Sequence, residues 1–257
     1  MPIGDYNECF YKNPIPRLLC RLFGTQDLHA HYRIRPMIDY FRTIARERGG
    51  SEAKVLEIGS GPGQNLFELS KIMRIDAVGY DLNPEHVALA RQVSKAKFGD
   101  RIPFHISDAT AVTESLEYDF ILFMDILEHI RNPENIVRQM DRFLKPGGSM
   151  VVSVPTPRYP KVFGRKMHER IGHLLDGYTI EALSALFPAN YQLTHKRYST
   201  GVLASAACAI QSRLLLRVSN LQLRWLASVP LLALRSCDWI NGKNVSSSLF
   251  AAYRKTS

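Results

Sequence analysis

The sequence predicts an α/β fold built on a doubly wound, seven-stranded and mostly parallel sheet. Strand and helix patterns alternate along the chain after residue 50, an order typical of parallel strands joined by right-handed crossovers. Several of the apolar strand segments end in a carboxylate. The first of them runs directly into glycines at alternate positions, in the segment KVLEIGSGPGQN at residues 54–65. With 257 residues, 46% of them hydrophobic and 22% charged, the chain can bury a full core.

The glycine-containing segment predicts a nucleotide-binding turn. The apolar residues 55–58 suit a buried parallel strand. Gly59, Gly61 and Gly63 lack side chains, so the backbone can adopt positive φ and approach a ligand closely. The helical pattern that begins at Gln64 would point free N–H groups at that ligand. Because such turns also occur without a ligand, the assignment depends on the strands that follow.

Three further predicted strands end in polar residues. The strand at residues 77–81 ends in Asp81, about 20 residues after the glycines, where a doubly wound sheet places the acid that binds a ribose. The strand at 104–108 ends in Asp108, where an adenine amino group could be met. The strand at 118–125 ends in Asp125 and leads into the segment ILEH at 126–129. Carboxyl ends of parallel strands share one edge, so these residues predict one crevice. The remaining strands are expected at 149–154, 191–199 and 247–254.

The succession of motifs resembles the class I S-adenosylmethionine-dependent methyltransferases. The segments that carry this resemblance are EIGSGPG, YDLNPE, SDA, DILEHI and FLKPGG followed by MVVSVP, within about residues 50 to 195. They are most similar to the small-molecule branch that includes the ubiquinone-type O-methyltransferases. The resemblance implies a Rossmann-like methyltransferase fold with a closing antiparallel pair of strands. It also implies S-adenosyl-L-methionine as cofactor, held by Glu57, Gly59, Ser60, Gly61, Gly63, Asn65, Asp81, Leu82, Asp108, Ala109 and Asp125.

Two alternatives share this fold. A nicotinamide-dependent oxidoreductase would carry the pattern G-x-G-x-x-G, but the sixth position here is Gln64. The spacing G-x-G-x-G, preceded by Glu57, therefore favours the methyltransferase. The second alternative is a non-catalytic cofactor-binding or assembly protein, because a fold does not fix a function.

Substrate-binding candidates come from two regions outside the glycine turn. Residues 1–48 predict an N-terminal helical cap, with a helix at 27–48 that, by the resemblance, lies over the cofactor. Residues 155–176 form the segment after the fifth strand, and such loops carry specificity in this architecture. The alternative for the helix is that its polar residues are merely solvated. The candidates are His29, Tyr32, Arg33, His168, His173 and Tyr178.

Residues 49–257 predict the methyltransferase domain, with an insertion at 200–246 before the last strand. The insertion is too long for a structureless loop in a compact domain. Apolar residues from Leu203 to Trp225 recur at spacings of three and four, which predicts one amphipathic helix broken at Pro230. Residues 201–240 either roof an apolar substrate or contact an anionic membrane surface, or they pack on the domain or on a second subunit.

Charge and cysteine content narrow the classes of partner. The net charge is +9, and residues 196–257 contribute +8 of it through 9 Lys/Arg and 1 Asp/Glu. The crevice region is nearly neutral, and no Asn/Asp-Pro-Pro-aromatic turn follows the fourth strand, so a nucleic-acid substrate is not expected. The four cysteines are far apart, and no signal peptide is evident. We expect a cytoplasmic protein, with peripheral contact at the inner face of a membrane as an open alternative.

Methyl transfer from a sulfonium is an in-line displacement, so the enzyme must hold the acceptor against the methyl group. A hydroxyl acceptor also needs a base, and Glu128 and His129 follow the fourth strand as catalytic candidates. The alternative for His129 is a structural or orienting hydrogen bond. No metal is expected, because one Glu-His pair offers fewer ligands than a metal site requires. The sequence thus predicts methyl transfer to a small molecule, with a hydroxyl on an apolar or lipid-linked acceptor favoured.

Overall fold

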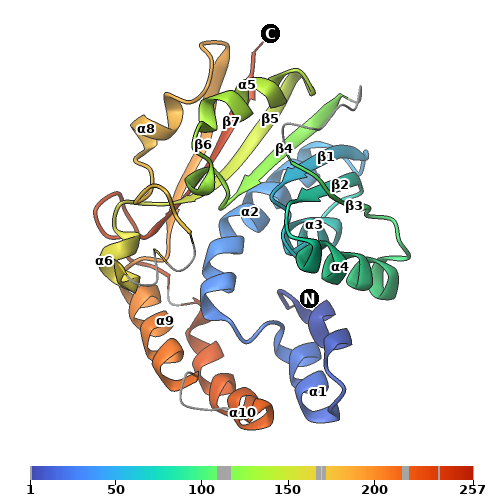
Figure 1. Cartoon of the computed structure of the whole chain (residues 1–257), viewed down its shortest axis with the longest axis vertical. Coiled ribbons are helices and arrows are strands. Elements are labelled where there is room, and N and C mark those ends of the chain that lie inside the picture. The colour runs from blue at the N-terminus through green and yellow to red at the C-terminus, as the bar shows by residue number, and fades with distance from the viewer. Residues whose placement is uncertain are drawn as a thin grey trace.

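A seven-stranded sheet forms the framework of the molecule and occupies the upper half of Figure 1. The computed structural model describes residues 2–108, 117–165, 169, 172–215, 220–236 and 238–256. The strand order is β3-β2-β1-β4-β5-β7-β6, with β7 antiparallel to both β5 and β6. The predicted doubly wound, mostly parallel sheet and its closing antiparallel pair are confirmed. The strands are β1 (Ala53–Ile58), β2 (Ile75–Asp81), β3 (Phe104–Ile106), β4 (Tyr118–Met124), β5 (Leu144–Pro155), β6 (Tyr191–Ser199) and β7 (Ser248–Lys255).

The sheet has its topological switch point between β1 and β4. Val55 of β1 lies opposite Ala77 of β2 on one side and opposite Phe120 of β4 on the other. The chain leaves β1 toward β2 and β3, whereas it leaves β4 toward β5. The connections therefore diverge, and a crevice is expected beyond the carboxyl ends of these two strands. The glycine turn follows β1 and residues 125–129 follow β4, so both border this crevice.

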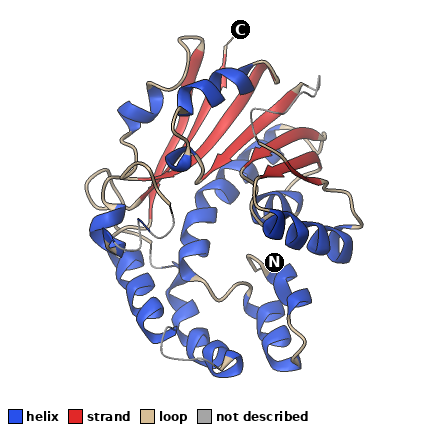
Figure 2. Cartoon of the chain, in the orientation of Figure 1, coloured by secondary structure: helices blue, strands red, loops and turns tan. Residues whose placement is uncertain are grey.

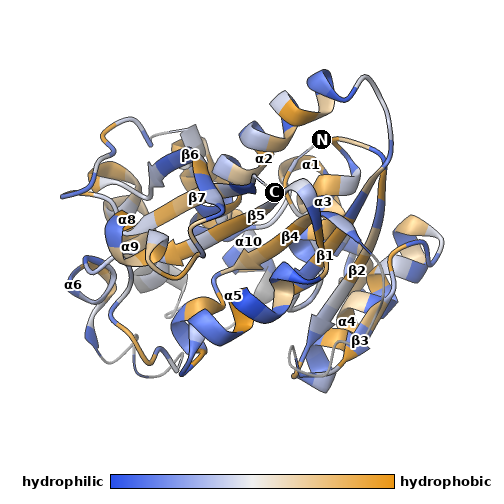
Figure 3. Cartoon of the chain, turned by 90° about the horizontal axis from the view of Figure 1, so that it is seen from above, coloured by the Kyte–Doolittle hydropathy of each residue, from blue (hydrophilic) through white to orange (hydrophobic). Residues whose placement is uncertain are grey.

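Helices cover both faces of the sheet (Figure 2). On one face, α2, α3 and α4 pack on Val55 and Phe120, and on the other face α5 and α8 pack on Leu56 and Phe123. Figure 3 shows β4 and β5 as largely hydrophobic and α5 as more hydrophilic. The helices are η1 (Asp5–Phe10), α1 (Pro14–Phe23), α2 (Leu28–Glu47), α3 (Gln64–Ser70), α4 (Pro84–Val93), η2 (Ser94–Phe98), η4 (Leu127–His129), α5 (Pro133–Asp141), α6 (Tyr159–Phe163), α8 (Ile180–Ser184), α9 (Val202–Leu215), α10 (Leu221–Leu232) and η5 (Ala233–Ser236).

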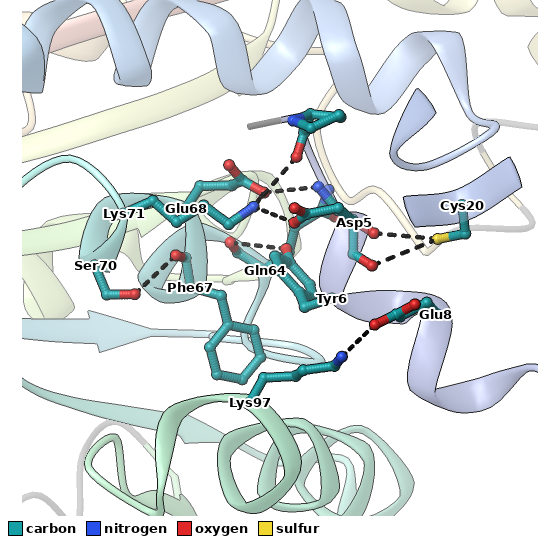
Figure 4. Close-up of polar contacts among 12 residues, drawn as sticks. Asp5, Tyr6, Glu8, Cys20, Gln64, Phe67, Glu68, Ser70, Lys71 and Lys97 are labelled. Carbon is teal, nitrogen blue, oxygen red and sulfur yellow. Dashed lines mark hydrogen bonds and ion pairs between the residues drawn. The ribbon is translucent and has the colours of Figure 1, made fainter. Parts of the chain in front are cut away.

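The N-terminal segment is fastened to α3, the helix that begins at the glycine turn (Figure 4). The Tyr6 hydroxyl donates to the Gln64 carbonyl at 3.2 Å, and the Gly4 N–H donates to Glu68 Oε1 at 2.7 Å. Lys71 Nζ lies 2.5 Å from Asp5 Oδ1 and 3.0 Å from Glu68 Oε1. Hydrogen bonds between partly buried charged groups are stronger than neutral ones. The segment therefore supports α3 from outside the sheet.

The predicted helix at 27–48 is confirmed as α2. It begins after Asp27, whose side chain accepts from the His29 N–H at 2.9 Å, and this bond caps the helix. Its Ile34, Met37 and Phe41 are buried against the same face of the sheet as α3 and α4. The division of the chain into a cap at 1–48 and a domain at 49–257 stays a prediction.

The insertion contains two helices, so the prediction of one helix from Leu203 to Trp225 is wrong. The first helix, α9, ends at Leu215, and Asn220 begins α10 by accepting hydrogen bonds from two backbone N–H groups, at 2.9 and 3.2 Å. An asparagine cap competes with a continuous helix, because it satisfies the N–H groups that the preceding turn would otherwise bind. Pro230 lies inside α10, two residues before its end, and the helix continues past it although proline has no N–H to donate to the carbonyl of residue 226. Residues 216–219 are outside the described part of the chain.

The helices α1, α9 and α10 and the first turns of α2 enclose a second core, here named the helical lobe. It lies at the end of the molecule away from the sheet (Figure 1). Its buried residues include Cys20, Tyr32, Cys208 and Trp225, and the Trp225 side chain is fully buried. The segments from the two ends of the chain are thus packed on each other.

Truncation of Trp225 should destabilise the helical lobe. The Trp225→Ala variant should lose about 3–5 kcal/mol of unfolding free energy, because it leaves a large cavity. The matched control is Trp239→Ala, since Trp239 is 75% exposed and should change stability little. Urea unfolding followed by circular dichroism measures both. Equal midpoints for the two variants would contradict the packing described here.

Candidate functional site

The glycine turn after β1 has the left-handed backbone that the sequence predicts. Gly59, Gly61 and Gly63 have φ values of 70°, 53° and 83°. A Cβ on Gly59 would lie 2.7 Å from Ile126 Cδ1, and one on Gly63 would lie 2.6 Å from Phe104 Cζ. A Cβ on Gly61 would meet nothing within 4 Å. Gly59 and Gly63 are therefore required for packing, whereas Gly61 faces open space in which a ligand could approach the backbone.

Asp81 at the end of β2 is bonded to the glycine turn. Its Oδ2 accepts from the Gly61 N–H at 2.7 Å, and its Oδ1 accepts from the Asn83 N–H at 2.8 Å. Each carboxylate oxygen has a second lone pair that can accept a hydrogen bond from a hydroxyl group. The neighbouring Leu82 is 68% exposed, and Asp108 is exposed after β3. Ala109, the other predicted adenine contact, is outside the described residues.

Glu57 is a buried carboxyl group beside the turn. Its side chain is fully buried, and Oε1 accepts from Asn65 Nδ2 at 2.6 Å. Among the described residues, Glu57 Oε2, Ser60 Oγ and Gln64 Nε2 are buried without a hydrogen-bond partner. Desolvation by burial raises the pKa of Glu57 to about 8, although the bond from Asn65 opposes this shift. Buried polar atoms are normally paired, so these three atoms beside the turn have the capacity to bind a polar ligand or water.

Asp125 lies at the end of β4 with an unusual backbone. Its φ is 55°, a left-handed value that is uncommon for residues other than glycine. The carboxylate accepts from Ser153 Oγ at 3.2 Å and forms an ion pair with Arg33, with 3.1 Å between Arg33 Nε and Asp125 Oδ2. The structure thus brings Arg33 of α2 to the crevice, as the sequence predicts.

Glu128, His129 and His173 come together beside Asp125. The His129 Nε2 and His173 Nε2 atoms lie 4.0 and 3.7 Å from Glu128 Oε1. The Glu128 side chain is 1% exposed, and burial together with the charge of Asp125 raises its pKa well above the usual value. His129 Nδ1 lies 3.1 Å from the Gly172 carbonyl oxygen. Because a carbonyl can only accept, Nδ1 carries a proton, and in the neutral ring Nε2 then presents its lone pair.

Two predicted substrate-binding residues, Tyr32 and Tyr178, make hydrogen bonds that hold parts of the fold together. The Tyr32 hydroxyl donates to the Leu234 carbonyl at 2.5 Å, and its ring lies in the core of the helical lobe. Its expected place at the crevice is therefore corrected: successive residues of a helix point about 100° apart, and Arg33 takes the crevice side. The buried Tyr178 hydroxyl donates to the Leu127 carbonyl at 3.1 Å and ties the loop to η4. His168 lies outside the described residues.

Two aromatic residues near the candidate site were not singled out from the sequence. Tyr159 and Phe163 of α6 lie 6.1 and 5.2 Å from the His29 ring, and Tyr159 is 5.3 Å from the His173 ring. The rings thus extend from the first turn of α2 to the histidine cluster. The signal in the sequence was an aromatic pair at spacing four inside the loop already expected to carry specificity.

Comparisons with known proteins agree with this arrangement. A family model described as "Methyltransferase domain" matches residues 29–198. Norajmaline N-methyltransferase from Rauvolfia serpentina is 28% identical over 58% of this chain and 51% of its own length. Ubiquinone biosynthesis O-methyltransferase from Psychrobacter arcticus is 32% identical over 56% of this chain and 57% of its own. The chain therefore spans about half the length of the curated relatives it matches.

A solved structure shows the same fold. N-methyltransferase NodS from Bradyrhizobium japonicum WM9, in complex with S-adenosyl-l-homocysteine, has a TM-score of 0.55 and 15% identity, and the match covers 87% of both chains. The family model covers well over half of the sequence, and the seven-stranded sheet has the corresponding strand order. The chain belongs to the methyltransferase domain family, whose members depend on S-adenosylmethionine.

Proposed function

We propose that this protein transfers a methyl group from S-adenosylmethionine to a small-molecule acceptor, with a hydroxyl oxygen as the favoured acceptor atom. The observation that carries the proposal is the turn at the switch point, which has an open backbone at Gly61 and follows Glu57, whose Oε2 is buried and unpaired. A cofactor with an ammonium group and a ribose fits this set, since Glu57 and Asp81 offer acceptors on either side of the turn. The relatives named above include both N- and O-methyltransferases.

The cofactor would occupy the region between the glycine turn and the end of β2. Glu57 and Asn65 would bind the amino-acid part, and Asp81 would accept hydrogen bonds from the ribose hydroxyls. Leu82 and Asp108 would flank the base. The residues assigned to this role are Glu57, Gly59, Ser60, Gly61, Gly63, Asn65, Asp81, Leu82, Asp108, Ala109 and Asp125.

The acceptor would lie between the cofactor and the histidine cluster. Tyr159, Phe163 and His29 offer ring surfaces for an apolar acceptor, and their distances of 5.2 and 6.1 Å place them within contact of one another. His129 presents Nε2 as a proton acceptor, and Glu128 beside it would stabilise the protonated ring. This pairing favours a hydroxyl acceptor, which must lose a proton during transfer, and so supports O-methylation.

Substitution of Gly61 tests the cofactor assignment. The Gly61→Ala variant should bind S-adenosylhomocysteine at least about tenfold more weakly, because a methyl group would enter the ligand's space at a left-handed residue. Gly99→Ala is the matched control, since Gly99 has φ 61° and open space but lies outside the crevice. Thermal shift and calorimetry with S-adenosylhomocysteine and with NAD provide the measurement. Stabilisation of the wild type by NAD alone, or equal binding by the two variants, would overturn the proposal.

Burial of Glu57 predicts a pH-dependent stability of the ligand-free protein. A carboxyl with a raised pKa is protonated in the folded state and ionised in the unfolded state between about pH 4.5 and 8, so stability falls as pH rises through that window. Relative to Glu57→Gln, the wild type should lose about 1.4 kcal/mol per pH unit there. Urea unfolding at pH 5.5, 6.5 and 7.5 gives this difference. Parallel curves for the two proteins would show that Glu57 does not titrate in this range.

The helical lobe supports a second, narrower proposal: residues 201–240 contact an anionic membrane surface. Large apolar side chains are exposed along α9, α10 and the segment after them, namely Leu203, Ile210, Leu223, Leu226 and Trp239. Residues 201–240 contain four arginines and one aspartate, and this net charge of +3 complements anionic lipid headgroups. Among the described residues, no helix is both long and apolar enough to cross a membrane. Contact would therefore be at the surface of the bilayer.

Introducing negative charge on α10 tests the membrane proposal. The double variant Leu223→Glu/Leu226→Glu should lose most of its co-sedimentation with phosphatidylglycerol vesicles, because it places carboxylates at the lipid surface. Leu89→Glu on α4, whose side chain is 40% exposed, serves as the control. Phosphatidylcholine vesicles should bind neither protein strongly. The membrane proposal is contradicted if the wild type does not bind anionic vesicles, or if the double variant binds them as well as the Leu89→Glu control.

A further inference from the structure

We propose that Glu128, His129 and His173 form a binding site for one divalent transition-metal cation of the zinc type. One ligand atom from each residue lies within 4.8 Å of the other two. Two imidazole nitrogens and one carboxylate are a ligand set that binds zinc and leaves a coordination position open. The sequence offered only the adjacent Glu128 and His129. The fold supplies the third ligand from a loop more than forty residues away.

The ligand atoms are held toward a common point. The Nδ1–H of His129 donates to the Gly172 carbonyl, so Nε2 is left to bind a cation, as is usual for a metal-binding histidine. His173 follows Gly172 directly, and its Nε2 is 3.7 Å from Glu128 Oε1. Ligands about 2.1 Å from a tetrahedral ion lie roughly 3.3 Å apart. The separations of 3.7 and 4.0 Å, and the 4.8 Å within which all three atoms lie, are wider than this, so side-chain rotations would have to draw the ligands together around the ion.

The loop that carries His173 is fixed to η4 by hydrogen bonds that do not involve the ligand atoms. The Leu174 N–H donates to the Glu128 carbonyl at 2.9 Å, and the Tyr178 hydroxyl donates to the Leu127 carbonyl at 3.1 Å. The loop and η4 therefore hold their relative positions before any ion binds. This lowers the entropic cost of ordering the metal ligands. Such preorganisation is characteristic of a built site.

The burial and charge of the cluster also fit a cation. Glu128 Oε2 is buried and has no hydrogen-bond partner among the described residues. Arg33, whose charge acts on Glu128, is itself paired with Asp125 at 3.1 Å, so the negative charge of Asp125 offsets it beside the cluster. An unpaired buried carboxylate oxygen is costly, and a bound cation would satisfy it. The His129 side chain is 31% exposed, which leaves an approach for an ion and for an acceptor.

The catalytic consequence of the ion rests on the proposed function. A cation with an open position lowers the pKa of a bound acceptor hydroxyl, whose proton leaves to water. The oxygen then forms a bond to the methyl carbon of the sulfonium. The carbon–sulfur bond breaks with both electrons remaining on sulfur, which gives the methyl ether and neutral S-adenosylhomocysteine. In this state His129 contacts the ion and does not accept the proton.

Metal titration of the untagged, chelator-treated full chain tests the site. The wild type should bind one Co²⁺ or Zn²⁺ per chain, with Co²⁺ giving visible ligand-field bands, and millimolar Mg²⁺ should not displace it. Glu128→Gln and His173→Ala should each weaken binding by at least about 100-fold. His105→Ala is the matched control, because His105 is exposed on β3 and should leave binding unchanged.

The possible results distinguish a failure of the metal site from a failure of the proposed methyltransferase function. Absence of stoichiometric binding by the wild type, or unchanged binding in both ligand variants, overturns the metal site. Thermal shift with S-adenosylhomocysteine on the same proteins shows whether the variants are folded and tests the proposed function separately. Stabilisation by S-adenosylhomocysteine without metal binding would reject the metal site and leave the proposed function intact. Should one variant fail to fold, Glu128→Asp, which keeps the charge but shortens the side chain, should still reduce the affinity for Co²⁺.

Discussion

The close approach of Ile126 to Gly59 is the contact on which the candidate site depends. Ile126 occupies the space that any side chain at residue 59 would need, and a Cβ there would lie 2.7 Å from Ile126 Cδ1. This contact joins the turn after β1 to the turn after β4, so one packing interaction fixes the relative positions of the two turns that border the crevice. Close-packed interiors transmit small displacements, and a larger residue 59 would therefore move both turns.

Besides the turns after β1 and β4, helix α2 borders the crevice, and the Arg33–Asp125 ion pair holds it there. It is partly buried and ties the N-terminal half of α2 to the end of β4, with 3.1 Å between the charged groups. Asp125 keeps a left-handed backbone at this point, which costs about 1 kcal/mol or more and is maintained by its bonds to Arg33 and Ser153. The crevice is thus defined by elements from three separate parts of the sequence: the N-terminal helices, the glycine turn and the segment after β4.

The fold and the clustering of carboxylates at the strand ends could be predicted from the sequence because they depend on local patterns. Strand periodicity, alternate glycines and carboxylates at strand ends fix β1, β2 and β4 and place Glu57, Asp81 and Asp125 at one edge. The acceptor side depends on tertiary packing. Nothing local indicates that His173 meets Glu128, because a loop bonded to η4 brings it there. Tertiary packing also explains why Tyr32 lies in the helical lobe and not at the crevice. At Asn220 the side-chain cap begins a new helix although the apolar period continues through it.

The buried Glu57 has a further consequence for the energetics of cofactor capture. With a pKa of about 8, the carboxyl is mainly neutral in the ligand-free protein at neutral pH, and the pocket then carries one negative charge fewer than its sequence implies. An ammonium group placed against Oε2 would favour the ionised form, so binding would expel a proton into solution. The heat of binding would then vary with the ionisation enthalpy of the buffer. A substituent that cannot displace this proton would meet a neutral acid, and the pocket would in this way discriminate cationic from uncharged ligands.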